Sequence, residues 1–326
     1  SARLEGGATT FEGNFGYEGS AVVNVPLVED KLALRLVGYR RDRDGFIDNV
    51  VTGESDINGV ENTGGRVALG WTPNDSVQVI ATYYYEDFTA DSRGIVHTDL
   101  GDLQTKNPAT TGSDDETSIF NITAEATTDW ADVMYSFSNF KRDLLYRYPT
   151  AIDIFGGFAP ETNFGGQLLI QPQDVDMDTH ELRFTSNQEG RWDWTVGAFY
   201  SERDTFGESD VYNVDPAGAI TFPDGTPGGS EGDAASLLFQ RNVDQTQSEL
   251  AFYGEVTYDF SERTALTFGA RYFEFENRDG GQPIILQGEP FPGNPPYVET
   301  ETDFDGEVFK VSLSHEVLED SVVYAT

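Results

Sequence analysis

The chain has 326 residues, and its 57 acidic and 20 basic side chains give a net charge of −37. This charge argues against nucleic acid as a partner, because binding polyphosphate requires a basic surface. It contains no cysteine, which excludes disulfides and thiolate metal sites, and no apolar run approaches the ~18 residues of a transmembrane helix. Its 34 glycines and 13% aromatic residues indicate an ordered, turn-rich all-β chain rather than a disordered acidic one.

Alternation of apolar and polar residues with a period of two predicts antiparallel strands along the whole chain. The clearest runs, in chain order, are 31–39, 119–126, 192–201, 250–258 and 266–272. Counting all alternations gives about thirteen strands, the last of them incomplete. The chain begins without methionine and ends in a strand-like run, so we expect it to be a fragment of a longer protein.

The connections between these runs alternate between short and long. Short turns are predicted at 28–31, 72–76, 127–131, 187–191, 259–263 and 317–321. Long stretches rich in Gly, Pro and Asp lie between them, at 44–63, 88–116, 149–176, 203–245 and 278–303. A soluble sandwich has no reason for this alternation, whereas outer-membrane barrels have short periplasmic turns and long outer loops. The pattern predicts a transmembrane, antiparallel up-and-down β-barrel.

The first clear strand indicates how a strand of such a barrel passes from the membrane into water. The run at 31–39 passes without a turn signal into the charged residues 40–45. A tilted strand of ~10 residues crosses a bilayer. We therefore interpret 31–39 as a membrane crossing whose strand continues above the bilayer, where its charges meet water and carbohydrate.

Large aromatic residues gather beside the predicted short turns. Aromatic rings with one polar edge collect at membrane–water boundaries, although tryptophan also fills soluble cores. Together with the loop alternation, this position predicts a periplasmic aromatic girdle of Trp71, Trp130, Trp192, Trp194 and Tyr258.

Three blocks of sequence resemble TonB-dependent outer-membrane receptors. The segment "NVPLVEDKLALRLVGYRRDRDGFIDN" is similar to the start of the barrel in that family. The segments "GRVALGWTPNDSVQVIATYYYED" and "YGEVTYDFSERTALTFGARYFEFE" resemble later hairpins. These blocks mark the family well and its substrate poorly.

The resemblance implies a barrel of about 22 strands around an N-terminal plug domain, in the outer membrane of a Gram-negative bacterium. Residues 1–326 would then be a partial barrel domain holding the first 12–13 strands, without the plug and the C-terminal strands. The implied partners are the TonB energy-transducing complex, reached through the missing N-terminal region, the plug of the same chain, outer-membrane lipid and lipopolysaccharide, and a small-molecule nutrient. The implied function is active import of a ferric siderophore or similar chelate, cobalamin or a glycan.

Alternation also sorts the charged side chains within the predicted crossings. Charges are costly on the lipid side of a barrel strand. The lumen-facing set, which either makes a salt-bridged wall or contacts the plug, is therefore predicted as Arg35, Glu125, Arg183, Glu255, Arg271 and Lys310.

Substrate contact is expected higher up, in the long loops. Aromatic side chains on such loops suit sugars or flat chelates, and His97 lies in another long loop. The predicted substrate-contact residues, some of which would only hold the loops together, are His97, Phe206, Tyr212, Phe222, Phe239, Phe291 and Tyr297.

The segment 203–245 also leads to an expectation about ligand charge. It carries eight acidic residues against Arg203 and Arg241. An acidic loop over the mouth would repel anions, so the sequence predicts a neutral or cationic ligand.

No catalytic constellation or cofactor site is recognisable, and we expect the protein not to be an enzyme. Asp174, Asp176 and Asp178 imitate the start of a calcium loop, but Thr185 stands where such a loop needs its glutamate, so no metal site is predicted. These carboxylates share parity with lipid-facing Leu182 and should point outward, toward lipopolysaccharide, with a divalent-cation bridge to it as the minor alternative. A passive porin and an outer-membrane barrel enzyme remain as alternative functions.

Overall fold

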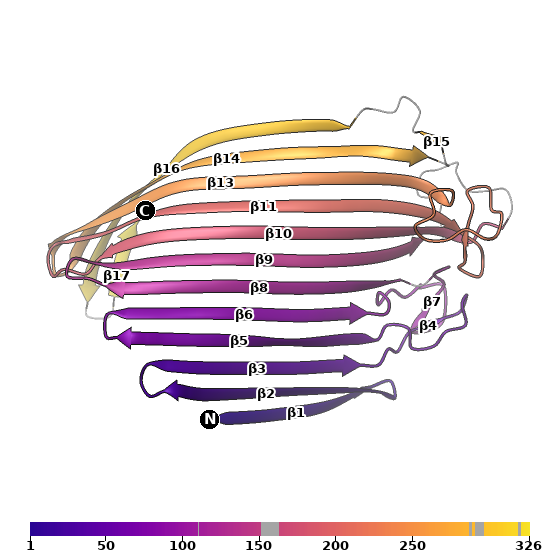
Figure 1. Ribbon diagram of the computed structural model, residues 1–326, viewed down its shortest axis with the longest axis horizontal. Helices are drawn as coiled ribbons and strands as arrows, with labels where there is room; N and C mark the ends of the chain where they lie inside the picture. The colour runs from indigo at the N-terminus through magenta and orange to yellow at the C-terminus, as the bar shows by residue number, and fades with distance from the viewer. Residues whose placement is uncertain (110, 151–162, 287–288, 291–296, 319–320) are drawn as a thin grey trace.

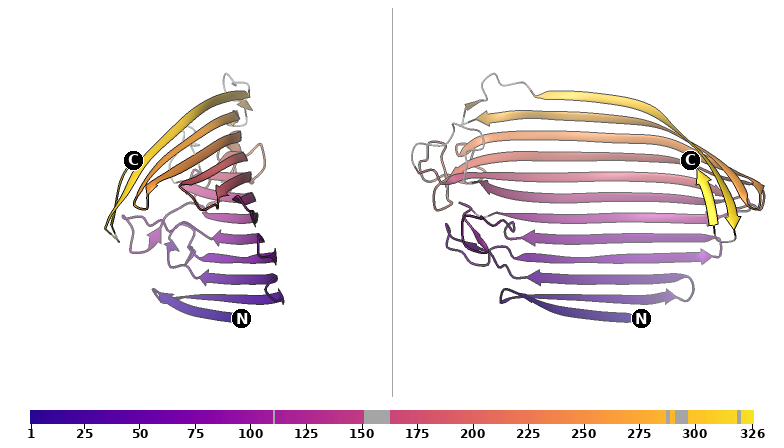
Figure 2. Two further views of the ribbon diagram at one scale, coloured as in Figure 1. Left: turned by 90° about the vertical axis from the view of Figure 1, so that its left-hand side faces the viewer. Right: turned by 180° about the vertical axis from the view of Figure 1, so that it is seen from behind.

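The structure is a computed structural model that describes residues 1–109, 111–150, 163–286, 289–290, 297–318 and 321–326. No helix in this part of the chain is long and apolar enough to cross a membrane. One large antiparallel sheet dominates, with the long connections at one end and the short turns at the other (Figure 1). The sheet is curved rather than flat (Figure 2).

Most strands are longer than a membrane crossing requires. In chain order they are β1 (Ala2–Phe11), β2 (Asn14–Val28), β3 (Leu32–Arg43), β4 (Asp48–Asn49), β5 (Val60–Asn74), β6 (Val77–Ala90), β7 (Gln104–Thr105), β8 (Gly112–Thr127), β9 (Ala131–Thr150), β10 (Gly166–Ser186), β11 (Trp192–Val214), β12 (Ile220–Thr221), β13 (Leu237–Ser261), β14 (Thr264–Leu286), β15 (Glu289–Pro290), β16 (Val298–Leu318) and β17 (Ser321–Ala325).

Strands that are consecutive along the main path are neighbours in the sheet, in the order β1-β2-β3-β5-β6-β8-β9-β10-β11-β13-β14-β16-β17. The short strands β12 and β15 pair with the ends of β11 and β14, and β4 and β7 form a separate parallel pair between two long loops. This topology confirms the predicted all-β, antiparallel up-and-down architecture.

The short turns lie where the sequence predicts them. Residues 29–31 join β2 to β3, and Asp30 there adopts a positive φ of 55°. In the turn between β8 and β9, the Thr128 hydroxyl donates to the Ala131 carbonyl at 2.7 Å. The predicted turn at 317–321 includes residues 319–320, which lie outside the described residues. At the opposite end, Glu12 and Gly13 both have positive φ, 49° and 87°, as a tight hairpin turn between β1 and β2 requires.

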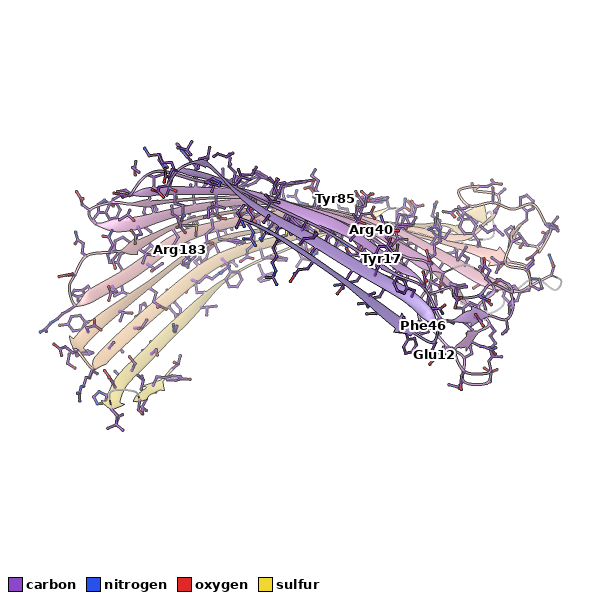
Figure 3. All side chains as sticks on the ribbon, turned by 90° about the horizontal axis from the view of Figure 1, so that it is seen from below. Glu12, Tyr17, Arg40, Phe46, Tyr85 and Arg183 are labelled. Carbon is purple, nitrogen blue, oxygen red and sulfur yellow. The ribbon has the colours of Figure 1, made fainter. Side chains whose placement is uncertain are left out.

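Cross-strand register sorts the side chains into two faces. We call one the outer face; a representative row across five strands is Leu34, Leu69, Ala81, Ile122 and Phe137. The other is the inner face, and the adjacent row on it is Arg35, Ala68, Thr82, Asn121 and Ser138. Side chains project from both faces along the whole sheet (Figure 3).

The two faces differ in polarity and burial. Near the short turns the outer face is apolar and stays exposed, as for Leu69 at 39% and Phe252 at 53%. The inner-face neighbour Ala251 is fully buried, as expected on the concave side of a curved sheet. An outward apolar band with a polar interior is the pattern of a transmembrane barrel wall.

The main cluster of buried apolar side chains lies at the long-loop end. It consists of Ala109, Leu168, Ile170, Tyr212, Val214 and Leu237, with Leu145 and Ile220 packed against it. The cluster therefore packs the loops against the strand ends. The part of the sheet near the short turns has no comparable cluster among the described residues, because its apolar side chains are exposed on the outer face.

Candidate functional site

The inner face carries the charged residues that alternation assigned to the lumen. Register places Arg35, Glu125, Arg183, Glu255, Arg271 and Lys310 together on it. Lys310 Nζ lies 2.9 Å from Glu255 Oε2, and Arg271 pairs with Glu249. Arg35 donates to the Asn24 side-chain oxygen at 3.3 Å. Exposed pairs of this kind contribute ~0–1 kcal/mol, so they make a hydrated, orienting wall rather than a stabilising core.

A tyrosine–glutamate cluster on the same face was missed by sequence reasoning. Tyr84 Oη donates to Glu86 Oε2 at 2.7 Å, and Tyr39 Oη contacts both Glu86 and Tyr84. Gly64 stands opposite both Tyr39 and Glu86 in the ladder, and a Cβ there would lie 2.4 Å from Tyr39 Oη. The sequence feature that could have indicated this cluster is Gly64, because the absence of a side chain there leaves room for the Tyr39 ring on the neighbouring strand.

Above these groups the inner face contains a hollow of about 340 Å³. The upper row of its wall is Tyr146, Gln171, Ser209 and Arg241, one residue from each of β9, β10, β11 and β13. The next row toward the membrane is Leu144, Gln173, Gly207 and Val243. The hollow joins four strands, so the sequence alone did not indicate it.

The predicted aromatic girdle forms a contiguous surface on the outer face over part of its length. Trp130 stacks against Phe184 and Trp194, with ring centroids 6.2 and 6.0 Å apart. Trp192 lies 4.5 Å from Tyr258 between ring centroids. Trp71 is on the outer face of β5, opposite Val79. All five girdle residues thus lie at the short-turn end of the sheet.

The predicted substrate-contact residues are not brought together. Phe206, Tyr212 and Phe239 were expected in a loop, but Phe206 and Tyr212 lie in β11 and Phe239 lies in β13. Register puts Phe206 on the outer face opposite Asp174, and Phe239 on the inner face opposite Val211.

The remaining residues of that set have local partners. Tyr212 is fully buried in the apolar cluster. Tyr297 Oη donates to outer-face Asp244 at 3.4 Å. Phe222 follows β12 in a loop, and His97 Nδ1 accepts from the Lys106 backbone N–H at 3.3 Å within its own loop. Phe291 lies outside the described residues. The inner hollow, rather than these aromatics, is therefore the candidate ligand site.

Apart from Glu208, which borders the inner hollow, the acidic residues of the segment 203–245 are not part of its wall. Asp204, Glu208, Asp210 and Asp244 lie on the outer face, and Arg203 and Arg241 lie on the inner face. Asp215, Asp224 and Asp233 accept backbone N–H groups within turns of the remaining loop. The sequence-based expectation of an acidic mouth is therefore not met, because strand pairing continues well past residue 203 and directs alternate side chains outward.

The same outward sorting extends across most of the sheet above its apolar band. The outer face there carries, among others, Asp42, Glu61, Asp87, Asp114, Glu116, Asp143, Asp174, Asp176, Asp178, Glu202, Glu274, Glu276, Glu301, Asp303 and Asp305. Basic side chains on this face are ion-paired, as Lys141 is to Asp176 at 2.8 Å. Burial and the neighbouring Asp143 raise the pKa of Asp174. The large negative charge of the chain is therefore concentrated on its outside.

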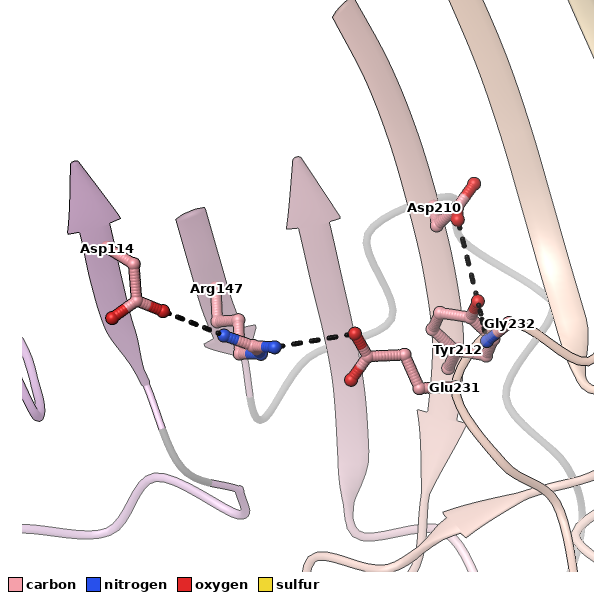
Figure 4. Close-up of polar contacts among 6 residues, drawn as sticks. All are labelled: Asp114, Arg147, Asp210, Tyr212, Glu231 and Gly232. Atoms are coloured by element: carbon pink, nitrogen blue, oxygen red, sulfur yellow. Dashed lines mark hydrogen bonds and ion pairs between the residues drawn. The ribbon is translucent and has the colours of Figure 1, made fainter. Parts of the chain in front are cut away.

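A polar network fixes the loop 215–236 to the outer face (Figure 4). Arg147 lies between Asp114 at 3.6 Å and Glu231 at 3.4 Å. Tyr212 Oη accepts the Gly232 N–H at 3.0 Å and donates to Asp210 Oδ2 at 3.5 Å. Burial, together with the adjacent Glu208, raises the pKa of Asp210 to about 6.

No group of three or more His, Asp or Glu side chains in the described part of the chain is placed to hold a metal ion. In the Asp174–Asp178 segment, Asn139 instead donates to Asp176 at 2.9 Å and to Asp178 at 2.8 Å. These carboxylates point outward, as their parity predicts.

Solved structures with a similar fold include receptors for ferric chelates. The ferric yersiniabactin uptake receptor FyuA from Yersinia pestis matches with a TM-score of 0.75 and 16% identity, over 99% of this chain and 46% of its own. The ferric-catecholate import receptor Fiu from E. coli K12, in its open form, matches with 0.65 and 13%, over 99% of this chain and 53% of its own. The ferripyoverdine receptor of the outer membrane of Pseudomonas aeruginosa matches with 0.63 and 13%, over 99% and 41%.

Searches against protein-family models and against curated proteins found no match. The chain spans about half the length of the solved structures it matches. These neighbours are named as uptake, import and outer-membrane receptors, so their names describe transport rather than catalysis. The chain has the fold of their barrel wall.

Proposed function

We propose that the chain forms part of the barrel wall of an outer-membrane receptor that imports a scarce small-molecule nutrient with energy supplied through TonB. The observation that carries the proposal is the sorting of side chains over the lower sheet, apolar outward and charged inward. A wall of this kind needs lipid on one side and a wet interior on the other. The fold shared with ferric-chelate receptors supports a metal chelate as the nutrient class, ahead of cobalamin or a glycan.

The inner wall supports an occupied lumen. Glu255 with Lys310 and Glu249 with Arg271 present paired charges on adjoining strands. Such charges offer hydrogen bonds to a plug domain of the same protein, and Arg35, Glu125 and Arg183 lie on the same face. We propose this plug contact as the role of the six inner-face residues.

The experiment is uptake of radiolabelled ferric chelates by cells that carry the complete gene or its deletion. The receptor role predicts uptake that is lost on deletion and also lost when a protonophore removes the membrane potential in gene-carrying cells. Gene-dependent entry that continues at the same rate in de-energised cells would instead identify a passive porin.

A further inference from the structure

One arginine in the wall of the inner hollow, and two arginines next to residues of that wall, have no acidic partner among the described residues. Arg241 belongs to its upper row, and Arg203 lies two residues from Thr205, another residue of its wall, on the same strand and face. Arg93 stacks on Tyr146, its guanidinium carbon 4.2 Å from the ring centroid, and lies 5.1 Å from that of Tyr148. Among the described residues, none of the three arginines has a carboxylate within 4.0 Å.

This absence contrasts with the rest of the sheet. Carboxylates outnumber basic groups almost threefold in the chain, and outer-face arginines such as Arg147 and Arg278 find two each. Glu208 also borders the hollow, but its carboxylate accepts a hydrogen bond from Gln240 on the outer face at 3.0 Å. A cation held near an apolar wall without a counter-charge is costly unless an anion joins it. The positive charge of these arginines is therefore not balanced by a nearby carboxylate, and the hollow favours an anionic ligand.

Unused hydrogen-bonding groups lie in the same place. Tyr146 Oη, Thr205 Oγ1 and Arg203 Nε are buried atoms, and none has a hydrogen-bond partner in the described part of the chain. Buried polar atoms are nearly always partnered in folded proteins, and a group of orphans indicates a missing ligand or water. The two hydroxyls belong to the wall of the hollow, and Arg203 lies two residues from Thr205 on the same strand and face.

The shape of the hollow comes from Gly207. A Cβ built on this residue would meet nothing within 4 Å, and its φ is not in the left-handed region. The glycine therefore leaves space rather than relieving backbone strain. Leu144 and Val243 flank it, so the floor of the hollow is apolar between polar edges. A volume of about 340 Å³ lies at the lower end of small-molecule sites.

We propose that this hollow binds an anionic, ring-bearing group of the ligand, which rests on Gly207, Leu144 and Val243 and directs its negative oxygens to Arg241 and Arg203. Tyr146 and Thr205 donate their hydroxyl hydrogens to the same oxygens, and Arg93 holds the Tyr146 ring in place. The inference rests on the proposed receptor function and adds the charge and the ring shape of one group of the imported ligand. It replaces the neutral or cationic ligand expected from the sequence.

The test compares benzoate with benzamide, which share a ring and differ in charge, on the complete receptor in detergent by titration calorimetry or saturation-transfer NMR. Benzoate should bind at least about tenfold more tightly, since hydrogen bonds to charged groups are the stronger ones. Arg241→Gln and Arg203→Gln should each remove most of this preference. Gly207→Leu should abolish binding of both probes without changing any charge.

Arg278→Gln is the matched control, because it removes the same charge from the ion-paired outer face. It should leave benzoate binding unchanged. Heat-modifiable migration on gels confirms that each variant is folded. Equal binding of the two probes, no saturable benzoate binding, or a preference that survives Arg241→Gln and Arg203→Gln would each overturn the anion site. None of these results affects energy-dependent uptake, so failure of the inference and failure of the receptor role are distinguishable.

Discussion

Replacing Leu69 with arginine should destabilise the folded barrel by about 2–4 kcal/mol, the cost of a basic side chain near the middle of the lipid face. Leu69 lies on the outer face between Leu34 and Ala81 and is 39% exposed in the absence of lipid. The side chain would have to reach the membrane surface or thin the bilayer. Denaturant unfolding of the complete receptor in lipid vesicles measures the loss.

Thr82→Arg is the matched control for this substitution. Thr82 is on the inner face, one residue from Ala81 on β6 and opposite Ala68 and Asn121. An arginine there enters a wet, charged interior, so the expected change in unfolding free energy is near zero. If Thr82→Arg is the more damaging of the two substitutions, the inner and outer faces have been assigned the wrong way round.

Replacing Tyr212 with alanine should release the loop 215–236 from the strand ends. Tyr212 is fully buried among Leu168, Val214 and Leu237, and truncating a buried aromatic side chain costs about 3–5 kcal/mol. The loss is local, because the lower wall does not contact this cluster. We expect external protease to cleave the loop in intact cells, while the receptor keeps its heat-modifiable barrel.

Tyr212→Phe separates the ring from its hydroxyl. It keeps the apolar contacts and removes the hydrogen bonds to Gly232 and Asp210, at a cost of about 1 kcal/mol. The loop should then remain largely resistant to protease. Equal cleavage of the alanine and phenylalanine variants would mean that the polar network, rather than the apolar cluster, holds the loop.

The lower half of the sheet was predictable from sequence because lipid allows few alternatives. A charged residue such as Arg183 between Leu182 and Phe184 can face only the interior, and parity then fixes its neighbours on each strand. The short turns were predictable for a related reason, since strands of fixed crossing length must reverse direction at one boundary. The residues at 187–191 and 259–263 carry the polar and turn-forming side chains that such reversals use.

The upper half was not predictable because both faces of the sheet there meet water. Phe206 and Asp204 share the outer face, so alternation no longer separates apolar from polar residues. The acidic stretch 203–214 was therefore interpreted as part of a loop, although it belongs to β11 and its backbone pairs with β10 and β13. The expectation of a neutral or cationic ligand rested on that interpretation, whereas the strand acids Asp204, Glu208 and Asp210 lie on the face opposite Arg203 and Arg241.

Contacts between distant loops were also invisible to local patterns. The loops at 44–59 and 91–111 are joined by the β4–β7 ladder, and Asn49 donates to the Asn107 carbonyl at 3.0 Å. Ile47, in the first of these loops, is also buried. Such pairings join residues more than fifty positions apart. The apolar and polar periodicity of the sequence therefore cannot predict them.

In the proposed orientation, this sheet is a barrel wall with its short turns in the periplasm and its long loops outside. Single cysteines at Asn74, Glu189 and Ala217 test it directly, and residues 1–326 contain no other cysteine. In intact cells expressing the complete receptor, a membrane-impermeant maleimide should label Ala217→Cys and leave Asn74→Cys and Glu189→Cys unmodified until the outer membrane is permeabilised. Surface labelling of Asn74→Cys or Glu189→Cys with protection of Ala217→Cys would reverse the orientation, and labelling of all three would contradict the membrane wall itself.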